Sequence, residues 1–109
     1  MSTLFRLTKN NTFKIFELTK NSPSYSEYVI YSNSVFGVGK VHIGRRLSNI
    51  DENGNELPFT DFVKPGTTEP LEFTTSQSGN GFSWTPQIGQ IKFYVIDADN
   101  DTNILIELA

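Results

Sequence analysis

The chain contains no cysteine, one histidine and one tryptophan among its 109 residues. The absence of cysteine excludes disulfides, thiolate nucleophiles and cysteine-ligated zinc or iron–sulfur sites. With His42 as the only histidine, a metal site or proton relay built on two histidines would need a second chain. The serines also lie in no G-x-S-x-G nucleophile motif. We therefore expect a protein that is not an enzyme.

Long apolar runs are also missing. No stretch approaches the roughly 20 apolar residues that a membrane helix needs. Residues 1–6 lack the long apolar segment and cleavage site of a secretory signal. We expect no signal peptide, no membrane contact, synthesis in a cytoplasm and a single domain spanning residues 1–109.

Aromatic residues, by contrast, are abundant, with nine Phe and four Tyr. Flat rings pack well against β-branched neighbours on a sheet. Turn signals recur along the chain about every 8–14 residues, and no segment keeps a helical period. These features predict an all-β fold, a single-domain antiparallel β-sandwich of seven to eight strands that is jelly-roll-like or Ig-like.

The clearest strand signal lies in the last twenty residues. Segments 90–96 and 104–108 alternate apolar and polar residues on either side of the polar segment 97–103. This pattern predicts an antiparallel hairpin with Phe93 and Ile106 in the core.

Similar reasoning predicts a hairpin at the N-terminus and another centred on residues 78–81. Glycines in the long fourth segment predict bulges or close backbone approach. The expected strands are, in order, 4–8, 12–18, 27–32, 35–47, 71–75, 82–85, 90–96 and 104–108.

The net charge of −3 is distributed unevenly. Residues 1–46 contain seven bases and two acids, whereas residues 47–109 contain two bases and ten acids. Either strands from the two halves interleave, so that opposite charges become neighbours, or one basic and one acidic surface attract neighbouring copies head to tail. A sequence pI of about 5.0 makes nucleic acid an improbable partner.

Three alternate acids, Asp97, Asp99 and Asp101, resemble the start of a calcium loop because Ca²⁺ takes six to eight oxygen ligands. The pattern departs from an EF-hand at its sixth position, Thr102, and at its twelfth, Leu108. The candidate metal residues are therefore these three acids, with calcium as the only cofactor considered. The alternative is a solvated turn without metal.

The lone tryptophan follows a glycine-rich segment. Trp84 and Asn80 form a candidate glycan-binding pair, in which the indole would stack on a sugar. The alternative role of Trp84 is packing in the core or at its rim.

Basic residues gather in the long fourth segment. Arg45 and Arg46 are candidate protein-contact residues, although neighbouring strand residues point to opposite faces and cannot form one clamp without a bulge. A solvated strand edge is the alternative. His42 alternates with Val41 and Ile43, and we expect it at the surface.

These observations favour a non-catalytic structural protein that assembles with other protein subunits, as a homo-oligomer or in a larger particle. A phage capsid, decoration or tail component incorporated into a virion fits a small, cysteine-free β-sandwich. The alternative is a glycan-binding, lectin-like module that uses calcium.

Overall fold

The computed structural model describes residues 3–18, 27–75, 80–83 and 89–108. Within these segments no helix is long and apolar enough to cross a membrane. The strands are β1 (Thr3–Thr8), β2 (Phe13–Leu18), β3 (Glu27–Ile30), β4 (Lys40–Arg46), β5 (Thr60–Asp61), β6 (Asn80–Ser83), β7 (Gly89–Ile96) and β8 (Asn103–Leu108).

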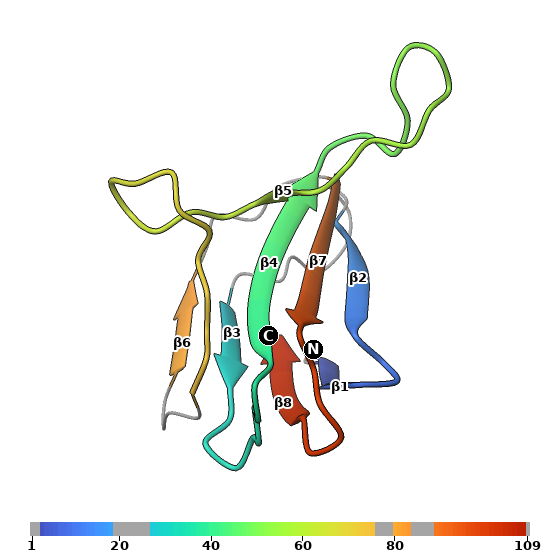
Figure 1. Cartoon of the computed structure of the whole chain (residues 1–109). Helices are drawn as coiled ribbons and strands as arrows, with labels where there is room; N and C mark the ends of the chain where they lie inside the picture. Colours follow the sequence, from blue (N-terminus) through green and yellow to red (C-terminus); the bar gives the residue numbers. More distant parts are fainter. Residues whose placement is uncertain (1–2, 19–26, 76–79, 84–88, 109) are drawn as a thin grey trace.

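The strands form two four-stranded antiparallel sheets, ordered β1-β8-β3-β6 and β2-β7-β4-β5, that face each other as two layers (Figure 1). The pairs β1–β8, β2–β7, β3–β6 and β4–β5 follow the pattern of one long hairpin rolled into a sandwich. This order is that of a jelly roll rather than an Ig domain. The predicted β-sandwich is confirmed.

The predicted terminal hairpins are wrong. Strands β7 and β8 lie in different sheets, as do β1 and β2, so residues 97–102 and 9–12 cross between the layers. Alternating apolar residues produce the same pattern in a hairpin and in two strands that face each other across a core. Sequence periodicity therefore identified the strands and their buried faces, but not which strands pair.

Two other strand predictions also change. The segment expected to run from 35 to 47 becomes a strand only at Lys40, because Gly37 takes a positive φ of 60° in a turn. In the hairpin expected around 78–81, Asn80 and Gly81 belong to β6, and within 71–75 only Phe73 forms a bridge, to Val41.

The core lies between the two sheets. Phe93 and Ile106 are fully buried, as predicted. Four rings, Phe5, Phe16, Tyr28 and Phe93, form a central cluster with centroids 5.3–6.4 Å apart, in tilted and edge-to-face contacts. The remaining buried apolar side chains are Leu7, Ile30, Phe36, Val41, Ile43, Ile91, Val95, Ile104 and Leu108.

The rolled arrangement explains the uneven charge of the two halves. Each of the four pairs joins a strand from the basic first half to a strand from the acidic second half. Contacts such as Lys40–Asp97 and Arg46–Glu56 connect the halves directly. The structure therefore follows the interleaved alternative.

The strand beside β4 is interrupted by an excursion. Thr60 and Asp61 pair with Arg45 and Gly44, and after residues 62–71 the chain returns so that Phe73 pairs with Val41. We call the excursion the 62–71 loop; its base is closed by the Leu71 N–H, which donates to the Phe62 carbonyl at 2.7 Å. A second projection, the 47–59 loop, follows β4 (Figure 1).

Candidate functional site

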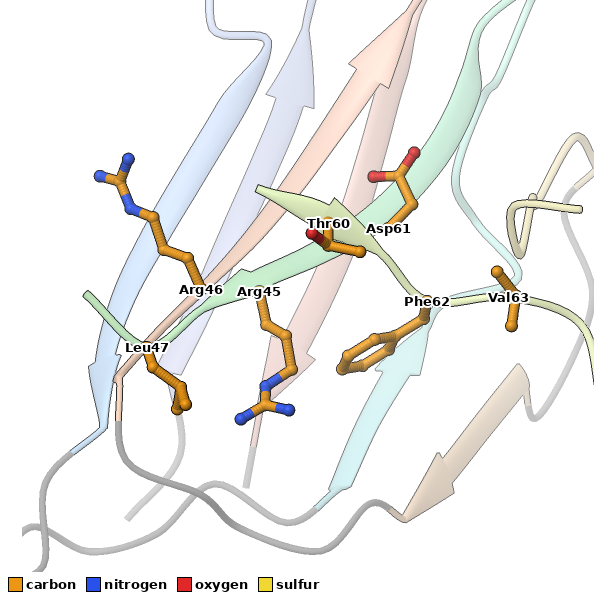
Figure 2. Close-up of a pocket in the computed structure, with 7 residues that line it drawn as sticks. All are labelled: Arg45, Arg46, Leu47, Thr60, Asp61, Phe62 and Val63. Carbon is orange, nitrogen blue, oxygen red and sulfur yellow. The ribbon is translucent and has the colours of Figure 1, made fainter. Parts of the chain in front are cut away.

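A hollow lies where β4 ends and β5 begins, between the bases of the two projecting loops. Its volume is about 530 Å³. We call it the Arg45 hollow; Figure 2 shows its lining residues, which are Arg45, Arg46, Leu47, Thr60, Asp61, Phe62 and Val63.

The side chain of Arg45 gives this hollow its charge. Figure 2 shows it pointing to the same side of the strand as Leu47 and lying beside the ring of Phe62. Leu47 and Val63 are exposed apolar side chains, at 64% and 48%. Arg45 makes no hydrogen bond or ion pair with any part of the chain that the structure describes. The hollow therefore combines apolar walls with a cation that has no partner in the described segments.

Arg46 points to the opposite side of the strand, as the alternation predicts (Figure 2). Its guanidinium donates to Gln90 Oε1 at 2.8 Å, to the Leu57 carbonyl at 2.6 Å and to Glu56 Oε1 at 3.1 Å. The same group stacks on Phe59, 4.2 Å from the ring centroid. Its contacts hold the 47–59 loop against the sheet, so Arg45 is the member of the pair left for a partner.

His42 is buried, so the prediction that it lies at the surface is wrong. It occupies the expected outer face, opposite Val41 and Ile43, but only 8% of the residue is exposed. The returning chain covers it: Nε2 donates to Glu72 Oε1 at 2.9 Å, and Nδ1 lies 3.5 Å from Asp61 Oδ2. Sequence periodicity could not indicate this contact, because Glu72 reaches His42 only after the 62–71 loop brings the chain back beside β4.

His42 contacts the carboxylates of Asp61 and Glu72, and Asp61 in turn accepts a hydrogen bond from Tyr94. Tyr94 donates its hydroxyl to Asp61 Oδ1 at 2.6 Å, and burial together with this hydrogen bond raises the pKa of Tyr94. The hydrogen bond from His42 lowers the pKa of Glu72. Because both imidazole nitrogens face carboxylates, neither is left to activate a nucleophile. The network connects four chain segments, which are β4, β5, the returning chain at Glu72 and β7.

The candidate metal residues do not converge on one point. Asp97 forms an ion pair with Lys40 at 3.7 Å. The carboxylate of Asp99 accepts from the backbone N–H groups of Val38 and Asp101, at 3.1 and 2.9 Å. Across the described segments, no group of three or more acidic or histidine side chains is placed to hold a metal ion.

Asp99 instead fixes the turn that precedes β4. The backbone hydrogen bonds lower its pKa, that from Val38 first among them. A Cβ on Gly37 would lie 2.4 Å from the same carboxylate, and the positive φ of Gly37 independently favours glycine. This local geometry accounts for the acid at position 99 without a ligand.

Only one of the two candidate glycan residues lies within the described segments. The backbone of Asn80 forms part of β6 and pairs with Ile30, whereas Trp84 lies outside the described residues. The glycan-binding pair expected from these two residues stays a prediction from sequence.

Comparison of the chain with protein-family models, curated proteins and solved structures gives no significant match. The site is therefore defined by its own geometry. Arg45 was predicted from the sequence as a protein-contact residue, and this stays a prediction. Leu47, Phe62 and Val63 were not singled out, because these apolar residues lie in irregular segments. The one sequence feature that could have indicated these three residues is that they are apolar and lie next to turn residues.

Proposed function

We propose that this protein is a non-catalytic assembly subunit, a small jelly-roll subunit of a larger particle such as a phage capsid, decoration or tail component. The observation that supports this best is the Arg45 hollow, where a guanidinium that pairs with none of the described residues lies between exposed apolar side chains. Arginine is enriched at protein interfaces, and paired hot-spot residues at their centres contribute most of the binding energy.

Two further features favour assembly. The 47–59 and 62–71 loops project away from the two sheets (Figure 1), residues at their bases line the hollow, and they carry the half-exposed apolar residues Ile50 and Val63. Jelly rolls are common in viral capsid proteins, although fold alone does not determine function. Because charges of the two halves are interleaved, a specific contact at Arg45 is a better basis for assembly than one between whole charged faces.

Light scattering coupled to size-exclusion chromatography tests this proposal. We expect a homo-oligomer or larger assembly whose mass falls when Arg45 is replaced by glutamate. A partner carboxylate would then meet a like charge, which is unfavourable. A monomer at every concentration and salt, together with no binding to a larger particle, would contradict the proposal.

A glycan-binding module is the second candidate, because lectin domains also use the jelly-roll order. A glycan array separates the two functions. Clear sugar binding by a stable monomer would favour the lectin, whereas an oligomer without sugar binding would favour assembly.

A further inference from the structure

A second hollow lies on the outer face of the β2-β7-β4-β5 sheet, the face to which Arg46 points rather than that of Arg45. Its volume is about 550 Å³. We call it the outer-face hollow; it is lined by Phe13, Ile15, Arg46, Glu56, Leu57, Pro58, Phe59, Lys92 and Tyr94.

The strand register builds the floor of this hollow. Phe13 pairs with Tyr94, and Ile15 pairs with Lys92, so these four side chains lie in two adjacent rows. Cross-strand partners project to the same face of a sheet. Half of Phe13 is exposed, at 51%, which leaves ring surface for a ligand.

The absence of a side chain at Gly44 allows Phe59 to lie close against the sheet. Gly44 pairs with Lys92 on β7, and a Cβ at this position would lie 3.1 Å from Phe59 Cβ and 3.3 Å from Asp61 Oδ1. Phe59 therefore lies directly over the sheet, where the Arg46 guanidinium stacks on it. The wall is held in place before any ligand binds.

Lys92 places a positive charge among the rings. Its Nζ lies 5.0, 5.1 and 5.5 Å from the ring centroids of Tyr94, Phe13 and Phe59. Lys92 forms no ion pair with the described residues.

Two acidic residues beside this hollow, Glu56 and Asp61, already have other partners. Glu56 pairs with Arg46, and Asp61 accepts from Tyr94. The cation therefore remains available to an anionic group from outside.

We propose that the outer-face hollow binds a carboxylated sugar. A pyranose ring offers C–H faces that pack on aromatic side chains, and its carboxylate would meet the ammonium of Lys92 in a charge-assisted hydrogen bond. Inorganic anions offer no such apolar face, and neutral sugars carry no such charge. The volume is within the range of small-ligand pockets.

This site is independent of the proposed assembly contact. The Arg45 side chain points to the other side of β4 (Figure 2), and the sugar site uses none of the residues predicted from the glycine-rich segment. Assembly and sugar binding can therefore be removed separately.

The test is a ¹H–¹⁵N NMR titration of the full chain with tetragalacturonate and with its methyl ester, which keeps the rings but removes the charge. We expect saturable shifts at Phe13, Phe59 and Lys92 with the acid, and much weaker binding of the ester. Lys92→Gln should weaken binding of the acid at least about tenfold, and Phe13→Ala roughly fivefold. Leu4→Ala, at an exposed position on the other sheet, is the control and should change nothing.

Three results would overturn the proposal. These are no saturable shifts with tetragalacturonate, equal binding of acid and ester, and binding by Lys92→Gln as tight as that of the wild type. The titration of the wild-type chain maps the site by itself. The proposal can therefore be rejected even if a variant folds poorly.

Discussion

Arg45 and Arg46 are neighbours in sequence with different environments. Arg46 has only 10% of its side chain exposed, and it binds Gln90, the 47–59 loop and a phenylalanine ring. Arg45 lines a hollow with apolar walls and pairs with no described residue. One strand thus presents a cation that stabilises the fold on one face and a cation available for binding on the other. The type of residue alone does not distinguish these roles; the partners supplied by other strands do.

The largest expected effect on the free energy of unfolding comes from the core between the two sheets. Phe93→Ala should lower the free energy of unfolding by about 3–5 kcal/mol, because it removes a fully buried ring that contacts three other rings. Chemical denaturation measures this loss, and Leu4→Ala should change stability by less than about 0.5 kcal/mol. Similar losses for the two variants would contradict the strand faces described above.

The next prediction compares the arginines directly. Arg46→Ala should destabilise by about 2 kcal/mol, since it removes charge-assisted hydrogen bonds and leaves the part-buried acceptors on Gln90 and Leu57 unsatisfied. Arg45→Ala should cost less than about 0.5 kcal/mol. Urea denaturation of both variants under identical conditions checks the difference. If the losses were equal, or larger for Arg45, the proposed division of roles would fail.

Acid should weaken the contact between His42 and Glu72. The hydrogen bond from His42 lowers the pKa of Glu72 in the folded state. A depressed carboxyl pKa contributes stability above its unfolded value, about 4.3, and this stability is lost as the pH falls through the folded value.

Glu72→Gln should therefore flatten the dependence of unfolding free energy on pH below about pH 4.3. Urea denaturation at several acidic pH values measures the slope. Glu69→Gln, in the exposed tip of the 62–71 loop, is the control. An unchanged slope in Glu72→Gln would show that the contact contributes nothing to stability.

The smallest expected effect is on the acidic loop. EDTA should leave the melting temperature unchanged, because Asp99 is satisfied by backbone N–H groups and the three acids do not converge. A ligand that binds the native state raises its stability. A rise of several degrees on adding calcium would therefore contradict this view and strengthen the lectin alternative.

Much of the fold could be predicted because apolar alternation reports which side of a strand is buried. It placed Phe93 and Ile106 in the core and His42 on the outer face. Pairing could not be predicted: in a jelly roll, strands such as β1 and β8 meet from opposite ends of the chain, and periodicity contains no information on distant partners. Arg45 could be singled out from the sequence because it is charged. The burial of His42 was not, because Glu72 reaches it from beyond a ten-residue excursion.

Sedimentation velocity of the wild type and of Arg45→Glu, over a range of protein and salt concentrations, tests the proposed role of Arg45 most directly. We expect the wild type to associate, and its association to weaken as salt rises, because charge interactions are screened over about 8 Å at physiological ionic strength. Arg45→Glu should remain monomeric while keeping its free energy of unfolding. Equal association of the two proteins, or a wild type that stays monomeric throughout and binds no larger particle, would contradict the proposed role of Arg45.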